Sequence, residues 1–381
     1  MKRINLLFII TALVALAGCG QTPAPATTPL APSAAPGATQ LPTATSAPPT
    51  VVPTTVPTSA PPTTVPTSAP TEAATPAPAT IVPTEAATPS AEQPAYLDNR
   101  SDPVAVLQSL YNAVNRREYA RAYGYWEAGA QVPAYDVFQN GYADTQQVEL
   151  VTGPVTGDAG AGQRYYAVPV TVRATQTNGT TQLFAGCYTL HQSNPANFGA
   201  PPFRPLAITA ATIQQVAPGA DPTTLMAAAC QNQGQPIDTS GQQNAYLDDR
   251  STPETVIQSL YNAINQKQYV RAYSYWQNNA PPFEQFQQGY AATQSVVLTL
   301  GTSSVGAAAG NLYYTLPVTV QATTSDGHTQ VFTGCYRLHL AQPQLQSPPF
   351  QPLGIDAAHL EQVANGDSLP APDPASCAAI S

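Results

Sequence analysis

The sequence predicts an α+β protein: two tandem domains, each with N-terminal helices packed on a curved antiparallel sheet, after a disordered Pro/Thr/Ala-rich stalk. Three observations predict it. Composition changes sharply near residue 94, the chain beyond that point holds two copies of one sequence, and in each copy apolar residues recur first at helical and then at strand spacing. The expected domains cover residues 95–230 and 245–381, joined by a linker at 231–244.

Residues 1–18 have the pattern of a bacterial lipoprotein signal peptide. A positively charged start is followed by an apolar run from Leu6 to Leu16 and by the sequence Leu-Ala-Gly-Cys, which ends at Cys19. The apolar run is too short for a stable transmembrane helix, and the pattern is typical of an export signal. We therefore expect lipidated Cys19 to anchor the mature protein to a cell membrane, on its extracytoplasmic face.

Residues 19–94 are predicted to form a disordered stalk. Beyond the cysteine the segment consists mainly of Thr, Ala, Pro, Ser and Val, and it contains no Lys or Arg. Such a chain has too little apolar surface to offset the entropy of ordering, and its prolines favour extended polyproline II conformations. Its many Thr and Ser residues are compatible with O-glycosylation, and a bare spacer is an equally good interpretation.

The remainder of the chain is an internal repeat. Residues 95–126 and 245–276 are identical at 21 of 32 positions, and the similarity continues to the end of each copy. The period of about 150 residues is longer than a solenoid unit and suits a complete domain with its own core.

Three helices are expected at the start of each repeat. Asp102 and Pro103 have the chemistry of an N-cap and first helical residue, and in the second repeat we expect Ser251 and Glu254 to form a capping box. Apolar residues at helical spacing follow. The expected helices include residues 107–114, 119–126 and 135–142 in the first repeat, and 257–264, 269–276 and 283–290 in the second.

Alternating apolar residues predict strands in the second half of each repeat. The first begins near Tyr166 and its counterpart near Tyr314. Asn178-Gly179 and Asp326-Gly327 then predict hairpins with type I′ turns. Returning strands over 184–190 and the equivalent segment, and last strands near 205–208 and 352–355, complete the predicted sheets.

The four cysteines after Cys19 predict one disulfide in each repeat. Cys187 with Cys230 and Cys335 with Cys377 occupy equivalent positions, and an even number of cysteines in an exported chain favours disulfides. The alternative, a zinc site, lacks the CxxC spacing that structural sites favour. We expect no metal and no cofactor.

Net charge excludes one class of partner. The chain has a formal charge of −9 and only 9% charged residues, without a basic stripe to neutralise phosphates. We therefore expect no nucleic-acid partner. Expected partners are the membrane, through the N-terminal lipid, and a small molecule, a glycan or an envelope protein.

Several motifs resemble the nuclear transport factor 2-like (SnoaL-like) family. They are the Tyr-Asn-Ala-Val/Ile-Asn runs before Tyr119 and Tyr269, the aromatic helix 119–126, the segments 138–142 and 286–290, and the strands from Tyr165 and Tyr313. The chain also resembles exported lipoproteins that carry such domains on Thr/Pro-rich stalks. The resemblance implies cone-shaped domains, which in this family include isomerases, dehydratases and binding domains. Cone domains of this family commonly pair through their sheets, and the linker is long enough for either docked or independent repeats. Because the polar face of each sheet carries residues such as Thr189 and Arg337, we favour a modest, partly polar contact in a pseudo-dimer.

Two equivalent pairs of single residues have a structural and a functional interpretation. Arg121 and Arg271 lie among tyrosines, where they suit either an anionic ligand or, as we prefer, stacking on Tyr and contact with nearby Asp side chains. His191 and His339 suit strand ends at the surface better than metal or acid–base chemistry, because the sequence offers them no partners.

Aromatic residues are the candidate ligand-binding set. They are Tyr123, Trp126 and Tyr166 in the first repeat, and Tyr273, Trp276 and Tyr314 in the second. Closing the core between helices and sheet is the structural alternative for the tryptophans.

No catalytic residue is expected, because polar groups that could face the cone differ between repeats. Asp144, Glu149 and Arg173 are replaced by Ala292, Val297 and Gln321. The predicted function is a membrane-anchored extracytoplasmic lipoprotein that binds a small or glycan-like ligand or an envelope protein without catalysis. The alternative is a cone-pocket isomerase, dehydratase or hydrolase, which would need a buried ionisable group with a hydrogen-bond partner.

Overall fold

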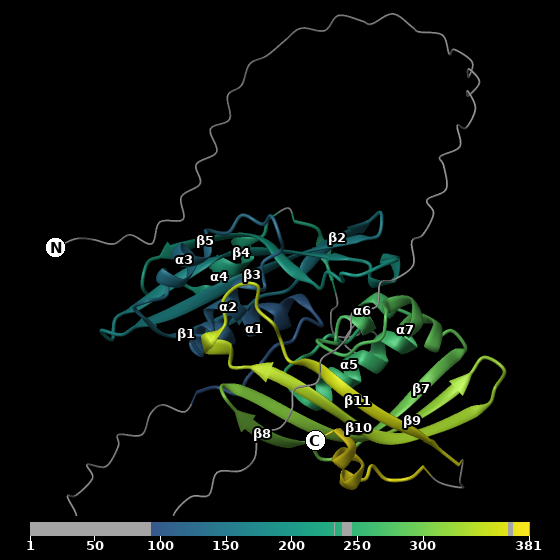
Figure 1. Cartoon of the computed structure of the whole chain (residues 1–381). Helices are drawn as coiled ribbons and strands as arrows, with labels where there is room; N and C mark the ends of the chain where they lie inside the picture. The colour runs from purple at the N-terminus through teal and green to yellow at the C-terminus, as the bar shows by residue number, and fades with distance from the viewer. Residues whose placement is uncertain (1–92, 232, 238–245, 365–368, 381) are drawn as a thin grey trace, which may run out of the picture. The chain divides into compact units, whose positions relative to one another are not determined.

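The computed structural model of the protein describes residues 93–231, 233–237, 246–364 and 369–380. The expected signal peptide, Cys19 and the stalk up to residue 92 lie outside the described residues, as does most of the expected linker. The described chain is α+β, with two antiparallel sheets and few helices (Figure 1).

In the first repeat, short helices precede a six-stranded sheet of order β5-β4-β3-β2-β6 in which β1 also pairs with β3. The elements are α1 (Pro103–Asn115), α2 (Tyr119–Tyr123), α3 (Tyr135–Asn140), β1 (Thr145–Thr152), β2 (Thr156–Gly160), β3 (Gln163–Gln176), β4 (Thr181–Ser193), the 3-10 turn η1 (Pro195–Asn197), β5 (Ala207–Val216), α4 (Pro222–Ala229) and β6 (Gln235–Pro236).

The second repeat has the same order of elements up to its last long strand, in a five-stranded sheet of order β11-β10-β9-β7 with β8 also paired to β9. The elements are α5 (Pro253–Asn265), α6 (Tyr269–Tyr273), α7 (Phe283–Gly289), β7 (Thr293–Leu300), β8 (Ser304–Ala308), β9 (Asn311–Thr324), β10 (Thr329–Ala341), η2 (Pro343–Leu345), β11 (Gly354–Val363) and η3 (Pro374–Ile380).

The caps of the long helices follow the predicted chemistry in one repeat and differ in the other. Asp102 caps α1, and its side chain accepts a hydrogen bond from the Ala105 amide. In α5 the N-cap is Thr252, which forms a capping box with Thr255. The predicted box of Ser251 and Glu254 was therefore wrong, because Ser251 lies one residue before the cap and its hydroxyl accepts a bond from the other repeat.

The predicted hairpins form, but their turns differ from type I′. At Asn178-Gly179 only the glycine has a positive φ, of 80°, and Gly327 is its counterpart at 85°. A type I′ turn needs positive φ at both central residues. That condition is met at Ala161-Gly162 and at Ala309-Gly310, the tight connections from β2 to β3 and from β8 to β9. Alanine gives little turn signal, so the sequence did not reveal them.

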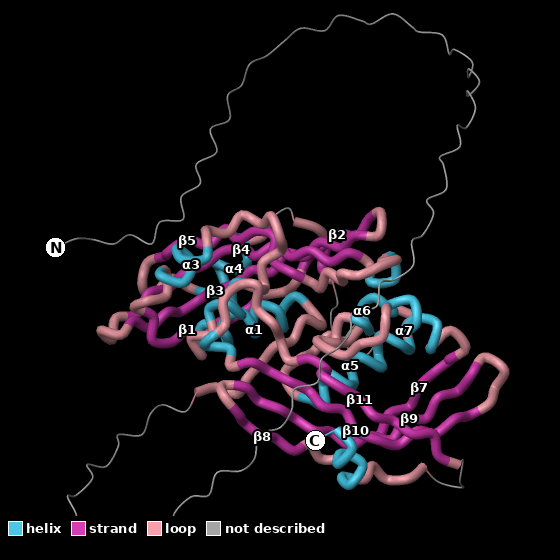
Figure 2. Tube along the Cα trace, viewed as in Figure 1, coloured by secondary structure: helices cyan, strands magenta, loops and turns pink. Residues whose placement is uncertain are grey.

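Each sheet buries one face against its own helices. Tyr166 and Val168 on β3 contact the core that α1 covers, whereas Cys187 on β4 points to the other face because side chains alternate. In the second repeat α5, α6 and α7 lie on one side of the sheet and η3 on the other (Figure 2).

Disulfides tie the C-terminal tail of each repeat to the outer face of its sheet. Cys187 is bonded to Cys230 just after α4, and Cys335 is bonded to Cys377 within η3. Both predicted pairings are confirmed. The bonded cysteines are 43 and 42 residues apart in sequence, so each disulfide closes a long loop.

The first sheet extends into the segment expected as a linker. Gln235 and Pro236 form β6, which pairs with β2, and the Ile237 amide donates to the Val155 carbonyl at 3.0 Å. Ile237 also packs against the first core. The ordered part of the first repeat thus continues past Cys230, and residues 238–245 of the linker lie outside the described chain.

Reciprocal hydrogen bonds join the two repeats, which belong to one compact unit. They connect equivalent groups of the segments 98–101 and 248–251, around an antiparallel bridge between Asn99 and Asp249. The bonds are Asp98 N to Ser251 Oγ, Asp248 N to Ser101 Oγ, Arg100 N to Asp248 O and Arg250 N to Asp98 O, at 2.7–2.9 Å. These bonds are polar and self-complementary, and they use the segments before the helices. The Gln344 side chain of the second repeat also donates to Glu118 of the first at 3.0 Å. None of these bonds belongs to the sheet-to-sheet pairing that is expected from the family resemblance.

Candidate functional site

The aromatic residues selected from the sequence lie in the two cores. Tyr166 is only 3% exposed, and the others are partly buried and pack against the core of their own repeat. Tyr123 meets Phe138 edge-on with ring centroids 5.3 Å apart, and Trp126 lies 6.3 Å from Tyr188. The six residues of the set are Tyr123, Trp126, Tyr166, Tyr273, Trp276 and Tyr314. Their contacts are those of core packing, and ligand binding by them stays a prediction.

A buried tyrosine pair crosses each core. The hydroxyls of Tyr111 and Tyr188 lie 2.7 Å apart, as do those of Tyr261 and Tyr336. Burial raises the pKa of Tyr188 to about 12, although its bond to Tyr111 partly opposes this. These hydroxyls are therefore protonated at neutral pH and satisfy each other's hydrogen bonds.

The indole nitrogen of each tryptophan is a further buried polar group. Nε1 of Trp126 and of Trp276 has no hydrogen-bond partner among the described residues. A buried donor of this kind is ordinarily satisfied by an ordered water molecule. Its occurrence in both repeats at one position marks it as a property of the shared fold.

The first repeat buries an arginine in a closed cluster. Arg121 is 1% exposed, and its Nε donates to Glu118 at 2.6 Å. Its guanidinium lies 4.4 Å from the ring centroid of Tyr96, and the nearby Tyr125 hydroxyl donates to Asp98 at 2.7 Å. The two terminal nitrogens of Arg121 donate to the Leu97 carbonyl and to Asn112 Oδ1. Every part of the guanidinium is thus engaged within the protein, which confirms the structural interpretation over an anion site.

The second repeat builds the same cluster with a neutral partner. Arg271 is fully buried, stacks 4.5 Å from the Tyr246 ring centroid, and donates to the amide oxygens of Gln268 and Asn262 at 2.7 and 2.8 Å. It too has no free donor to offer a ligand.

An exposed tyrosine stacked on a histidine stands out on the outer face of the first sheet. Tyr165 is 48% exposed, and its ring lies over that of His191 with centroids 4.8 Å apart and an angle of 24° between the planes. The two residues are direct cross-strand partners on β3 and β4. His191 Nδ1 lies 3.0 Å from Glu127, and Nε2 lies 2.6 Å from Gln163 Oε1. The histidine is fixed at both nitrogens, so it holds the tyrosine ring in place.

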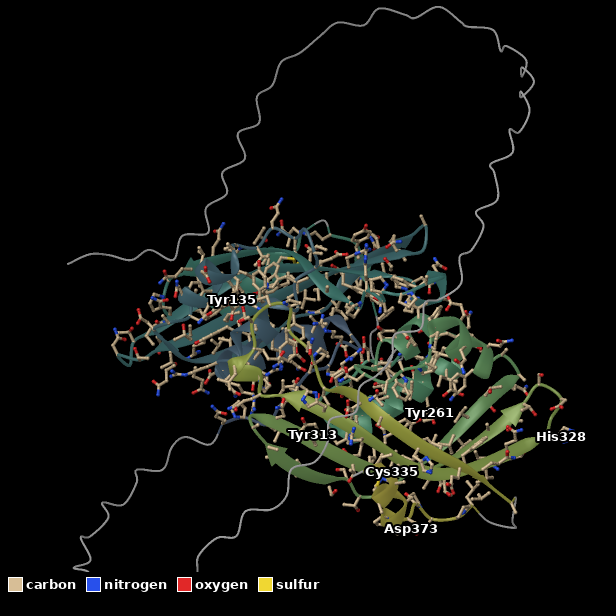
Figure 3. The ribbon with its side chains drawn as sticks, in the orientation of Figure 1. Tyr135, Tyr261, Tyr313, His328, Cys335 and Asp373 are labelled. Atoms are coloured by element: carbon tan, nitrogen blue, oxygen red, sulfur yellow. A yellow bond between two sulfur atoms is a disulfide. The ribbon has the colours of Figure 1, made fainter. Side chains whose placement is uncertain are left out.

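The second repeat has an equivalent arrangement. Tyr313 is 38% exposed and stacks on His339 with centroids 5.0 Å apart and an angle of 26°. Here the two imidazole nitrogens lie 3.1 Å from Gln277 and 2.8 Å from Asn311. Figure 3 shows Tyr313 at the end of the sheet opposite the hairpin that carries His328. We call Tyr165 with His191, and Tyr313 with His339, the tyrosine platforms.

Sequence reasoning placed the two histidines at strand ends but missed both tyrosines. Each follows from period-two alternation, since Tyr165 and Tyr166 are neighbours and only one of them can face the core. The signal was therefore present in the sequence. The buried member of the pair was selected because it matched the apolar face of the strand.

A shallow groove of about 550 Å³ lies between α5 and β7. Asn262 and Asn265 are its central polar residues, and both are already used: Asn262 accepts from the Leu247 amide and from Arg271, and Asn265 bonds the main chain of Val296. The full lining is Leu247, Gln258, Tyr261, Asn262, Asn265, Val296, Leu298, Thr299 and Leu300. The groove thus offers few unsatisfied polar groups to orient a ligand.

Comparisons with known proteins give no assignment: no family model matches the chain, and no curated protein matches it significantly. In the described parts of the chain, no three His, Cys, Asp or Glu side chains are grouped to hold a metal ion. The described helices include none that is long and apolar enough to cross a membrane.

Proposed function

We propose that this protein is a lipid-anchored, extracytoplasmic binding protein whose two repeats each hold a glycan-like ligand on a tyrosine platform, without catalysis. The observation that carries the proposal is the presence of the same exposed, stacked tyrosine in both repeats. The lipid anchor at Cys19 and the cone shape of the domains are part of the same proposal and rest on the sequence.

The chemistry of the platforms suits a sugar ring. A fixed aromatic face gives the C–H surface of a pyranose a large contact area, and tyrosine loses little conformational entropy because it has two side-chain torsions. Polar side chains hold the histidine beneath each tyrosine: Glu127 and Gln163 in the first repeat, and Gln277 and Asn311 in the second. Such groups hydrogen-bond hydroxyls at the edge of a stacked sugar.

Preorganisation supports the proposal further. The histidine beneath each tyrosine is held by two polar partners, so the ring is already in position before a ligand arrives. Rigid binding groups improve affinity by reducing the ordering cost of binding. An exposed aromatic residue without a binding role does not need such support.

Two platforms on one chain favour a polymeric ligand. When both sites engage one glycan, the second contact forms at a high effective concentration, and avidity exceeds the affinity of either site. Weak individual sites are thus sufficient for retention on a cell-wall polysaccharide.

Co-sedimentation of the full mature chain with insoluble polysaccharides, including peptidoglycan sacculi, chitin and cellulose, tests the proposal. We expect binding to at least one of them, about tenfold weaker in Tyr165→Ala or Tyr313→Ala and lost in the double variant. Tyr165→Phe keeps the ring and should keep binding, and Val137→Ala removes an unrelated exposed side chain as a control. Binding by the double alanine variant, or no binding of the unaltered chain to a broad glycan panel, would contradict the proposal.

A further inference from the structure

The two repeats differ at the edge of the sheet where β2 and β8 lie. In the first repeat β6 pairs antiparallel with β2, matching Gly157 with Gln235 and Thr156 with Pro236. The equivalent strand β8 pairs only with β9 among the described residues, and all five of its residues are exposed. Within the described parts of the chain, the second sheet therefore has an open edge where the first is covered.

The main-chain groups at this edge can be assigned from the turn. Ala309 and Gly310 form a two-residue turn, which closes on a hydrogen-bonded pair, here Ala308 with Asn311. Because bonded and non-bonded pairs alternate, the N–H and C=O groups of Val305 and Ala307 point away from β9. In the first repeat the same alternation turns Gly157 outward, and Gly157 is the residue that meets β6.

The open edge lacks the features that normally prevent pairing. β8 reads Ser-Val-Gly-Ala-Ala, without charge, proline or bulge, and Val305 is 62% exposed. Exposed edges in native proteins usually carry such protection. The first repeat has it, because Pro236 of β6 has no N–H to offer a further strand.

A carboxylate lies at the end of the open edge. In the first repeat Ile237 continues from β6 and bonds the carbonyl of Val155, in an apolar setting. The residue equivalent to Val155 is Ser303, whose side chain and amide bond the carboxylate of Glu254. Burial opposes ionisation of Glu254, but these hydrogen bonds hold its pKa below the ordinary value, so the group is charged at neutral pH.

We propose that the β8 edge binds an extended segment of a partner polypeptide, antiparallel to β8 as β6 is to β2, with a Lys or Arg side chain placed opposite Glu254. Main-chain bonds to Val305 and Ala307 supply the affinity, and the carboxylate selects the cationic side chain. Ile237 marks the corresponding position in the first repeat, where the surroundings are apolar.

Fluorescence anisotropy with two labelled peptides, TVTKTVT and TVTETVT, tests the proposal on the full mature chain. We expect the lysine peptide to bind at least tenfold more tightly than the glutamate peptide, with the difference reduced by salt. Glu254→Lys should reverse the preference. Asp326→Lys, at an exposed hairpin far along the sheet, is the matched control and should change neither affinity.

Proline substitutions in β8, which block the open edge, provide a second test of the proposal. Val305→Pro, or separately Ala307→Pro, removes an outward N–H without removing a bond to β9, and either should abolish binding of both peptides while polysaccharide binding is unaffected. Circular dichroism reports whether each variant is folded. The proposal would be overturned if the two peptides bound equally or if neither bound. It would also be overturned if the unaltered chain self-associated and Val305→Pro dissociated it, because a second copy of the chain would then occupy the edge.

Discussion

The two repeats hold the same buried arginine with different partners. In the first, Arg116 and Arg121 share the carboxylate of Glu118, with Arg116 Nε at 2.7 Å. In the second, Gln266 and Gln268 replace the outer arginine and the glutamate, and their side chains bond each other at 2.8 Å. The change is coordinated: removing the extra positive charge and the negative charge together leaves the central arginine satisfied. What the fold requires is a hydrogen-bond acceptor at this position, whether or not it is charged.

The largest expected effect comes from breaking this cluster in the charged repeat. Glu118→Ala leaves the buried Arg121 without its carboxylate and should lower the free energy of unfolding by about 3–5 kcal/mol. Gln268→Ala removes a neutral acceptor and should cost less, about 1–3 kcal/mol. Urea denaturation measures both, and Glu149→Ala, from an exposed ion pair, is the control with an expected change within about 0.5 kcal/mol.

A double substitution sharpens the comparison. Arg116→Gln with Glu118→Gln gives the first repeat the partners of the second and should recover most of the stability that Glu118→Ala loses. If the double variant were as unstable as Glu118→Ala, a neutral pair of glutamines would not be able to replace the charged Arg–Glu pair around Arg121, and this account would be wrong.

The disulfides should have similar effects in both repeats. The loops they close differ by one residue, so the chain-entropy model gives about 4 kcal/mol for each. Replacing Cys187 and Cys230 by Ala should therefore destabilise the protein about as much as replacing Cys335 and Cys377. Thermal unfolding of the two variants, together with proteolysis near each C-terminal tail, measures this. A much smaller loss of stability in the Cys187 and Cys230 variant would show that β6 holds the first tail in place without the disulfide.

Alkaline pH should weaken the cores of both repeats. Burial raises the pKa of Tyr188 and of Tyr290 to about 12, whereas an unfolded tyrosine has a value near 10. Above pH 10 the unfolded chain loses protons that the folded chain keeps, so stability present below pH 10 is lost as pH rises to 12. The expected slope is about 1.4 kcal/mol per pH unit for each such tyrosine. Denaturation at pH 8, 10 and 11 checks it, and Tyr188→Phe should reduce the slope.

Local patterns in the sequence were sufficient for much of the fold. The helix at 103–115, the hairpins at Gly179 and Gly327 and both disulfides follow from capping, turn and cysteine signals. Contacts between distant segments were not predictable in this way. Ile237 looked like part of a polar linker because its partner, the Val155 carbonyl, is far away in sequence.

The candidate site was predicted less well than the fold, for a physical reason. The sequence predicted ligand binding by Tyr166 and Tyr314, on the apolar face of their strands. It marked Tyr165 and Tyr313 only as the start of each strand, although these two lie on the outer face and are exposed. What marks those two as special is the fixed histidine beneath each ring. That arrangement depends on Glu127 and Gln277, which come from the segment after the second helix and which no pattern within the strand reveals.

The most direct test of the central claim is the number of ligand molecules bound per chain. Isothermal titration of the full mature chain with a short soluble oligosaccharide, chosen from the polysaccharide that co-sediments, should give two sites. Tyr165→Ala and Tyr313→Ala should each leave one site, and the double variant none. Two sites that persist in the double variant would contradict the claim that the tyrosine platforms bind the ligand.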